Sequence, residues 1–290
     1  MLRRKAFWLC LGVFACAGSV AVAAPGVSRR WQDQRTPAAG TPSSIGDYSA
    51  GCVQGAQPLA LSGEGYLVMH PSRLRYFGHP ALIAFLQALG HSVHAQGLGV
   101  VLIGDLSQPR GGRAPGGHAS HQTGLDVDLW YWQPKQAAKG ALSDAERESL
   151  KARSVLDGLP GKEPSIQARL VKRVRSLLQL TAEQPGVERV FVHPIIKRTL
   201  CAEAGSERAW LGKLRPWYGH DDHFHVRLAC PADSPQCTPQ APVPAGDGCG
   251  ELDFWFSEAA QKARAQGRKE YETKVAHPKP MPAACATLLQ

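Results

Sequence analysis

Two stretches of the chain alternate between apolar and polar residues, which is the pattern of a half-buried β-strand. In residues 124–130 the polar positions are Asp126 and Asp128, and in residues 223–228 they include two histidines. Successive side chains of a strand point to opposite faces, so the two aspartates should share one face of their strand, and the two histidines one face of theirs. The alternation therefore predicts two strands that each present a polar pair.

Other periodicities predict the remaining large elements. Residues 79–90 have proline at a helix start, apolar residues at helical spacing and glycine at the stop. Residues 166–180 carry apolar side chains on one side and Lys/Arg on the other, as an amphipathic helix does. Residues 98–106 and 187–192 are rich in Val, Leu and Ile, which favours buried strands.

A last helix is expected near the C-terminus, over residues 251–274. It should lie on the surface and turn a few apolar side chains inward. The inward positions are expected to be Leu252, Trp255, Phe256 and Ala259.

The distribution of these elements indicates one domain. Residues 24–65 are rich in Gly, Pro, Ser and Thr without a sustained apolar period, so we expect an extended N-terminal arm, with regular structure beginning later. Residues 66–290 mix helix and strand patterns with no internal repeat and no linker. The fold class is therefore expected to be α+β: a single domain with a central, mainly antiparallel sheet flanked by helices, its termini tied by disulfides.

The first 23 residues have the layout of a secretory signal peptide. A basic start is followed by an apolar run over residues 6–22 and by small residues suited to cleavage. An uncleaved membrane anchor is the alternative, but the run is short, and a lipidated Cys16 is disfavoured because Leu is missing at the usual place. We therefore expect export, no stable membrane anchor, and a mature chain that begins near residue 24.

The net charge of the chain indicates a class of binding partner. Cleavage would remove three positive charges and no negative one, so the formal charge falls from +9 to about +6. A basic exported protein suits an anionic polymer, although ordinary solubility charge is the simpler alternative. Nucleic acid is excluded as the expected partner, because the sequence has no zinc-finger spacing, no basic helix and no interleaved aromatic platform.

Six cysteines remain after the leader, and an even count in an exported protein favours disulfides over free thiols. Fifteen pairings are open, of which the local pair that brackets a proline-containing loop is the safest. A thiolate zinc site is less favoured because no C-x-x-C spacing occurs. The six are Cys52, Cys201, Cys230, Cys237, Cys249 and Cys285, and the local pair is Cys230 with Cys237.

Five of the eleven histidines lie in two short polar stretches, residues 116–128 and 219–225. Imidazole with carboxylate is the donor set of catalytic zinc sites, which need three protein ligands and an open position for water. The H-x6-D pair His121 and Asp128 can supply two ligands, and the H-x-H pair on the second strand can supply a third ligand and a general base. These stretches predict one zinc site assembled from both.

The other polar residues of the stretches have weaker predicted roles. His118 is balanced between a ligand role and a surface or supporting role, and Asp126 is expected to orient a histidine rather than to bind metal. A purely hydrogen-bonded polar cluster is the alternative to a metal site. The aromatic residues that flank both stretches could either pack in the core or form the wall of a cleft. They are Trp130, Tyr131, Trp132, Trp217 and Tyr218.

Competing catalytic classes lack their signatures. The sequence has no H-E-x-x-H helix, no G-x-S-x-G elbow and no G-x-x-x-x-G-K-[ST] phosphate loop.

Several motifs together resemble the penicillin-insensitive murein endopeptidases, part of the wider group of lysostaphin-type and D-Ala-D-Ala metallopeptidases. The resemblance covers nearly the whole mature chain. The motifs that carry it are LIGDLSQPRGG at 102–112, residues 118–128, RVFVHP at 189–194, RPW at 215–217 and residues 220–228.

This resemblance implies a zinc hydrolase of the Gram-negative periplasm that cleaves the D-alanyl to meso-diaminopimelyl cross-link of peptidoglycan. Insensitivity to penicillin follows, because the family has no serine nucleophile to be acylated. By correspondence of motifs, the ligands are His121, Asp128 and His225, and His118 is an additional histidine beside the metal. His223 and His220 correspond to the catalytic histidines, with His223 expected to take the proton of water and His220 to help stabilise the oxyanion.

The resemblance also implies features away from the metal. The family's disulfides correspond to Cys52–Cys285, Cys201–Cys249 and Cys230–Cys237. It implies dimers with a second metal at the interface, but the loop after Gln133 offers no convincing residues for that second site.

Two other functions are kept open. A D,D-carboxypeptidase that trims terminal D-Ala would share the same metal core. A non-catalytic, metal-bearing wall-binding protein is disfavoured because His220 and His223 would then have no task.

Overall fold

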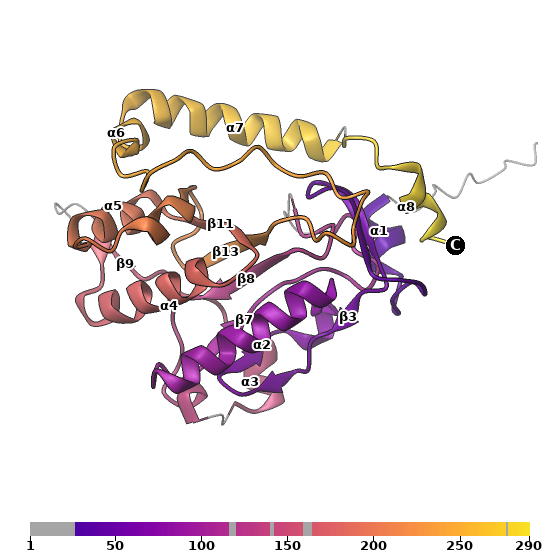
Figure 1. Ribbon diagram of the computed structural model, residues 1–290, viewed down its shortest axis with the longest axis horizontal. Helices are drawn as coiled ribbons and strands as arrows, with labels where there is room; N and C mark the ends of the chain where they lie inside the picture. Colours follow the sequence, from indigo (N-terminus) through magenta and orange to yellow (C-terminus); the bar gives the residue numbers. More distant parts are fainter. Residues whose placement is uncertain (1–26, 116–119, 140–141, 159–163, 277) are drawn as a thin grey trace, which may run out of the picture.

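The computed structural model describes residues 27–115, 120–139, 142–158, 164–276 and 278–290. The expected signal peptide and His118 lie outside these residues. A seven-stranded mixed sheet forms the centre of the fold (Figure 1). In spatial order its strands are β12 (Leu214–Pro216), β11 (Val187–Val192), β13 (His223–Leu228), β8 (Asp126–Trp130), β7 (Val101–Ile103), β5 (Tyr66–Val68) and β4 (Ser62–Gly63).

Most neighbouring strands of this sheet run antiparallel, as expected. Only the β11–β12 and β5–β7 pairs are parallel. The two alternating stretches form adjacent antiparallel strands, β8 and β13, in which Asp128 lies opposite His225 and Asp126 opposite Arg227. The prediction of an α+β fold with a mainly antiparallel central sheet is confirmed.

The alternation of β8 and β13 divides their side chains between two faces. Val127, Leu129, Phe224 and Val226 are fully buried in the main hydrophobic core. Helices α2 (Pro80–Ala95) and α4 (Val171–Glu183) contribute to the same core and contact each other. The aspartates and histidines therefore lie on the face of the sheet turned away from this core.

Helix α2 continues beyond its predicted end at Gly90. Pro80 occupies the first turn, and the His79 side chain accepts a hydrogen bond from the amide of Ala81 at the N-terminus. A Cβ at Gly90 would lie 2.5 Å from the carbonyl oxygen of Glu64, so this glycine allows close packing rather than ending the helix.

Two predicted helices have different boundaries in the structure. The 166–180 segment begins as β10 (Ser165–Ile166), paired with β9 (Leu156–Asp157), and a 3-10 turn η3 (Ala168–Leu170) precedes α4. The C-terminal helix is divided into α6 (Leu252–Trp255) and α7 (Glu258–Ala276), because Ser257 breaks it and caps the second part through its hydroxyl. Phe256 and Ala259 were wrongly expected to be inward: both are exposed, and Ala260 is buried instead.

The N-terminal segment has more regular structure than its composition suggested. After α1 (Val27–Gln32), β1 (Ser43–Asp47) and β2 (Ala50–Gln54) form an antiparallel hairpin, and β3 (Gln57–Pro58) pairs with β6 (Phe77–Gly78). These strands are too short for an apolar period to emerge from a Gly- and Ser-rich sequence.

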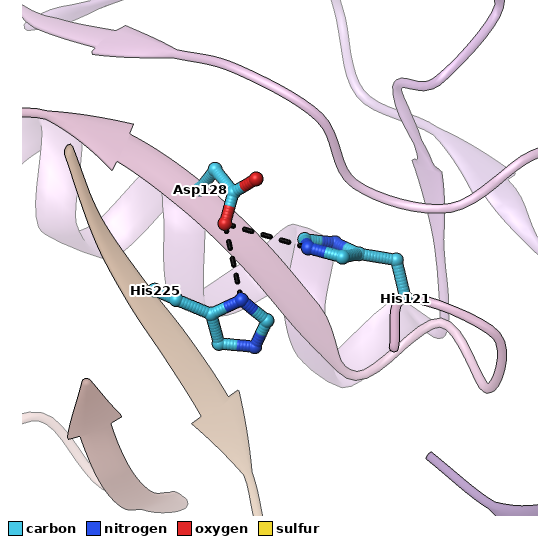
Figure 2. Close-up of side chains that lie close together, drawn as sticks. All are labelled: His121, Asp128 and His225. Atoms are coloured by element: carbon cyan, nitrogen blue, oxygen red, sulfur yellow. Dashed lines mark ion pairs between the residues drawn. The ribbon is translucent and has the colours of Figure 1, made fainter. Parts of the chain in front are cut away.

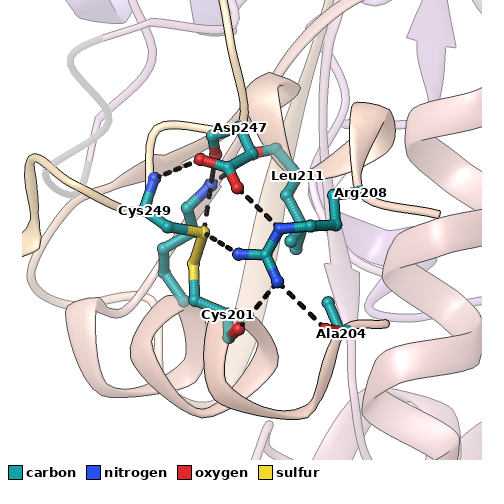
Figure 3. Close-up of a disulfide and its surroundings, with 7 residues drawn as sticks. Cys201, Ala204, Arg208, Leu211, Asp247 and Cys249 are labelled. Atoms are coloured by element: carbon teal, nitrogen blue, oxygen red, sulfur yellow. Dashed lines mark hydrogen bonds and ion pairs between the residues drawn. A yellow bond between two sulfur atoms is a disulfide. The ribbon is translucent and has the colours of Figure 1, made fainter. Parts of the chain in front are cut away.

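Three disulfides are present, and they are the three that the resemblance implies. Cys52–Cys285 joins β2 to α8 (Ala283–Thr287), so both ends of the described chain meet there. Cys201–Cys249 fixes the end of α5 (Pro194–Glu203) to the loop around Asp247 (Figure 3). Cys230–Cys237 closes a seven-residue separation after β13.

The remaining elements are short. Among the described residues, no helix combines the length and the apolar character needed to cross a membrane. The short elements are η1 (Pro71–Arg73), η2 (Ala137–Lys139), α3 (Asp144–Ser149) and η4 (Ala209–Lys213).

Candidate metal centre

The structure gathers His121, Asp128 and His225 into one buried cluster (Figure 2). Their ligand atoms all lie within 4.8 Å of one another. Asp128 Oδ1 is 3.1 Å from His225 Nδ1 and 3.4 Å from His121 Nε2. Asp128 and His225 face each other across the β8–β13 pair, whereas His121 comes from the loop before β8.

The loop that carries His121 is held in an unusual conformation. His121 has φ 64°, in the left-handed region that non-glycine residues rarely adopt. The neighbouring Gln122 side chain accepts a hydrogen bond from the amide of Gly51 and donates one to the carbonyl of Ser49. The Ser44 hydroxyl donates to the carbonyl of Thr123. The β1–β2 hairpin therefore fixes the loop that aims His121 at the cluster.

A carboxylate behind the cluster orients His225. Asp126 Oδ1 lies 2.7 Å from His225 Nε2, and Arg227 Nε donates to the same oxygen. Since a carboxylate accepts, His225 carries its proton on Nε2 and presents Nδ1 to Asp128. Burial opposes ionisation of Asp126, but Arg227 and His225 outweigh it and hold the pKa of this carboxyl far below its usual range. The expected role of Asp126, orienting a histidine, agrees with these contacts.

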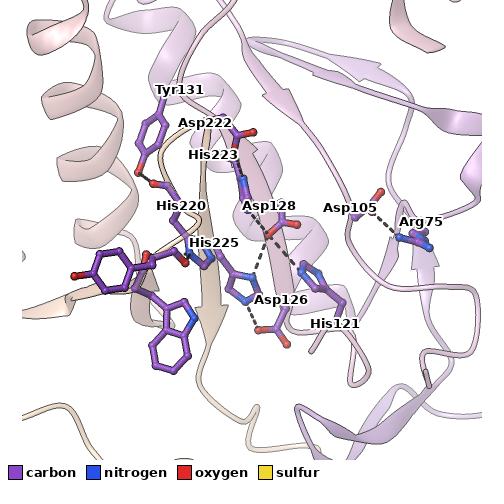
Figure 4. Close-up of polar contacts among 12 residues, drawn as sticks. Arg75, Asp105, His121, Asp126, Asp128, Tyr131, His220, Asp222, His223 and His225 are labelled. Atoms are coloured by element: carbon purple, nitrogen blue, oxygen red, sulfur yellow. Dashed lines mark hydrogen bonds and ion pairs between the residues drawn. The ribbon is translucent and has the colours of Figure 1, made fainter. Parts of the chain in front are cut away.

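His223 lies at the rim of the same cluster and has a carboxylate of its own (Figure 4). Its Nδ1 is 2.5 Å from Asp222 Oδ1, and its Nε2 is 3.8 Å from Asp128 Oδ1. Burial lowers the pKa of His223, but the charge of Asp128 and the hydrogen bond to Asp222 outweigh it and raise that pKa to about 9. Asp222 was not predicted from the sequence, where its only signal is a carboxylate directly before the H-x-H pair.

His220 completes the group of histidines. Its ring centroid is 5.0 Å from that of His223 and 6.2 Å from that of His225. Its Nδ1 lies 3.3 Å from the carbonyl oxygens of Trp217 and Tyr218, so this nitrogen carries the proton. Burial, followed by the neighbouring charge of His223, lowers the pKa of His220 to about 4. At neutral pH His220 is therefore uncharged and presents Nε2 as an acceptor.

The electrostatics of the cluster suit a divalent cation. Burial alone would raise the pKa of Asp128, yet the histidines around it, His121 first, hold that pKa well below its usual range. The cluster thus offers one ionised carboxylate and two imidazole nitrogens aimed at a common point, which is the donor set of catalytic zinc sites. The ligand atoms of these three residues are therefore chemically suited to a metal ion.

A pocket of about 180 Å³ opens beside this cluster. Asp128 and His223 form its inner wall, and Trp130, although only 5% exposed, also lines it. Of the flanking aromatic residues, Trp130 lines this pocket, Tyr131 is fully buried in the core and Trp217 is 57% exposed.

The arrangement as a whole is that of a metal-dependent hydrolase, with a His–Asp–His donor set, an imidazole backed by a carboxylate and an adjacent polar pocket. In a comparison with protein families, residues 44–290 match the family described as penicillin-insensitive murein endopeptidase.

Individual relatives agree with the family match. A penicillin-insensitive murein endopeptidase of Klebsiella pneumoniae is 44% identical over 283 residues, which cover 96% of this chain and 95% of that protein. Proteins with the same name from Yersinia pestis and Salmonella arizonae are 45% and 44% identical over 261 residues, covering 89% of this chain and 90% of theirs. The chain belongs to the family of penicillin-insensitive murein endopeptidases, which are metallopeptidases of peptidoglycan.

Proposed function

We propose that this chain hydrolyses the D-alanyl to meso-diaminopimelyl cross-link of peptidoglycan in the periplasm, with zinc held by His121, Asp128 and His225. The observation that carries the proposal is the convergence of these three buried ligand atoms within 4.8 Å. The family match over residues 44–290 supports the substrate. Three disulfides and the leader pattern of residues 1–23 support export of a chain whose mature part comprises the arm 24–65 and the domain 66–290.

A zinc ion at these residues would polarise the scissile carbonyl and make water a stronger acid and nucleophile near neutral pH. Asp126 supports this function from behind, since it fixes the tautomer in which His225 Nδ1 faces the cluster.

His223 is proposed as the general base. Asp222 holds its Nδ1 proton, which leaves Nε2 directed toward the cluster, 3.8 Å from Asp128 Oδ1. The negative charge of Asp128 is a main cause of the raised pKa of His223. A cation held by that carboxylate would offset the charge and lower the pKa of His223 toward neutrality, so that Nε2 could accept a proton.

For His220 the hydrogen bonds favour a role other than the expected oxyanion donor. A neutral imidazole whose Nδ1 proton is directed at two backbone carbonyls has only a lone pair on Nε2. We therefore propose that His220 accepts a hydrogen bond from the substrate or from the attacking water and so orients it. His118 stays a predicted supporting residue beside the metal.

Product analysis tests the reaction. Purified protein is incubated with a defined cross-linked muropeptide dimer and, separately, with a monomeric pentapeptide that ends in D-Ala-D-Ala. The proposal expects the dimer to be converted to two monomers, identified by mass, without release of free D-alanine from the pentapeptide. Free D-alanine as the main product would indicate the carboxypeptidase instead, and binding to sacculi without turnover would indicate the wall-binding protein.

A variant separates the base from the ligands. His223→Ala should retain bound zinc and lose roughly 10²- to 10⁴-fold in kcat, the range for loss of a general base. His225→Ala should lose zinc as well as activity. Full activity of His223→Ala would contradict the role proposed for it.

A further inference from the structure

The pocket beside the metal cluster is lined by both acidic and basic side chains. Its lining includes Arg73, Asp105, Asp128 and His223. Asp105 is nearly buried, and its two oxygens face two arginines: Oδ2 is 2.7 Å from Arg75 Nη1, and Oδ1 is 3.6 Å from Arg73 Nη1. One carboxylate thus serves two guanidinium groups.

The two arginines differ in how firmly they are held. Arg75 is mostly buried and also donates to the carbonyl of Pro115, so its role is to fix the structure; Figure 4 shows it paired with Asp105. The Arg73 side chain is 48% exposed, and its pair with Asp105 is the looser one. Arg73 can therefore turn its guanidinium toward a ligand in the pocket without leaving a buried charge behind.

The turn that carries Arg73 is flanked by residues with strained backbone conformations, which cluster at ligand-binding sites. Arg73 ends the 3-10 turn η1, and the residues on either side of this turn, His70 and Leu74, both have φ 53°. Glu148 anchors the turn by accepting from the amide and the hydroxyl of Ser72. Three non-glycine residues in the described part of the chain have positive φ, namely His70, Leu74 and His121. All three lie at the metal cluster or at this turn.

The position of the pocket limits which part of a substrate can reach Arg73. Asp128 belongs to the cluster at which the bond is cut, and its amide donates to the carbonyl of Asp105, so Arg73 and the reacting bond share one small cavity. The pocket has a volume of about 180 Å³. The first candidates for an anionic group that Arg73 binds are therefore the residues on either side of the scissile bond.

In the cross-link of the proposed function, on which this inference rests, one such residue carries a carboxylate. The carbon of diaminopimelate that bears the leaving nitrogen also bears a carboxylate, whereas the D-alanine on the other side offers only a methyl group. We propose that Arg73 is a specificity-determining residue that binds this carboxylate on the leaving-group side. A guanidinium matches a carboxylate with two parallel hydrogen bonds, which a neutral carboxamide cannot accept in the same way.

The test uses two cross-linked muropeptide dimers that are identical except that one has this carboxylate and the other a carboxamide. Wild-type protein should cleave the carboxylate dimer with a kcat/KM roughly 10- to 100-fold higher, the range for a charge-assisted pair. Arg73→Met should lose that factor on the carboxylate dimer, mostly through KM, and change less than about threefold on the carboxamide dimer. Arg73→Lys should recover part of the loss.

Two controls accompany this test. Arg169→Met removes an exposed arginine that bonds only to Gln167 among the contacts of the described chain, and it should leave both rates unchanged. Zinc content measured by mass spectrometry should be the same in all variants. An equal loss on both dimers, or no loss on either, overturns the proposal for Arg73 while cleavage by the wild type still upholds the endopeptidase. Failure of the wild type to cleave either dimer overturns the proposed function itself.

Discussion

At the scale of single residues, the site depends on tautomers that neighbouring carboxylates select. Asp126 and Asp222 each accept from one histidine and thereby decide which nitrogen faces the cluster. The three residues of the candidate metal cluster could be predicted from sequence, because the H-x6-D and H-x-H patterns bring their side chains together. The partner Asp222 could not, because its contact depends on the backbone of a turn rather than on strand alternation.

Replacing Asp126 by Asn tests this selection. An amide can donate as well as accept, so the His225 tautomer is no longer fixed and Arg227 loses its charged partner. We expect zinc affinity to fall roughly 10- to 100-fold, measured by competition with a chromogenic chelator. Asp233→Asn, at a side chain that is 61% exposed, is the matched control and should bind zinc as the wild type does. Wild-type affinity in Asp126→Asn would contradict the orienting role.

A buried lysine gives a pH dependence of stability away from the metal. Lys197 is fully buried, and its Nζ donates to the carbonyls of Leu211 and Asp247. Figure 3 shows Leu211 and Asp247 near the Cys201–Cys249 disulfide. Burial, and next the charge of Arg215, lower its pKa from 10.5 to about 8. Between these values the unfolded chain binds more protons than the folded one, so stability should rise with pH across this window.

Between pH 8 and 10.5 the free energy of unfolding of the wild type should rise by roughly 3 kcal/mol relative to that of Lys197→Met. It is measured from denaturant unfolding at several pH values. Lys172→Met, at an exposed lysine of α4, should keep the wild-type slope. Parallel pH profiles for wild type and Lys197→Met would show that Lys197 titrates normally.

At the scale of elements, strand alternation was the most informative signal. It predicted β13 with its observed bounds and all of β8, although the strand begins at Asp126 rather than at residue 124, and it placed Asp128 and His225 on faces that proved to be shared. Helix boundaries were less predictable. Gly90 lies inside α2 because the helix packs closely against Glu64 at this point, and that contact is visible only once the fold is known. The β1–β2 hairpin was missed because its strands contain mostly small residues whose partners lie near residues 122–123.

The disulfide that ties β2 to α8 should contribute more to stability than the local one. Cys52–Cys285 spans 233 residues, and Cys230–Cys237 spans seven. Loop-closure entropy gives at most about 5 kcal/mol for the long loop and about 2 kcal/mol for the short one. The double variant Cys52→Ser/Cys285→Ser should therefore unfold at a lower denaturant midpoint than Cys230→Ser/Cys237→Ser. The opposite order would contradict this view of the termini.

At the scale of the whole molecule, the two faces of the central sheet have different roles. One face packs against α2 and α4, and the other carries the metal cluster and its pocket. The formal charge of about +6 expected after removal of the leader would favour association with an anionic cell-wall polymer. Dimerisation stays a prediction of the family resemblance, to be measured by sedimentation of the mature protein.

The central claim is that His121, Asp128 and His225 hold the ion on which cleavage of the cross-link depends. The most direct measurement is a zinc titration of chelator-stripped protein, with cleavage of a defined cross-linked dimer followed by mass spectrometry. We expect no cleavage without metal, recovery that is complete at about one zinc per chain, and no recovery in His121→Ala. Full cleavage by the stripped protein, or by His121→Ala, would contradict it.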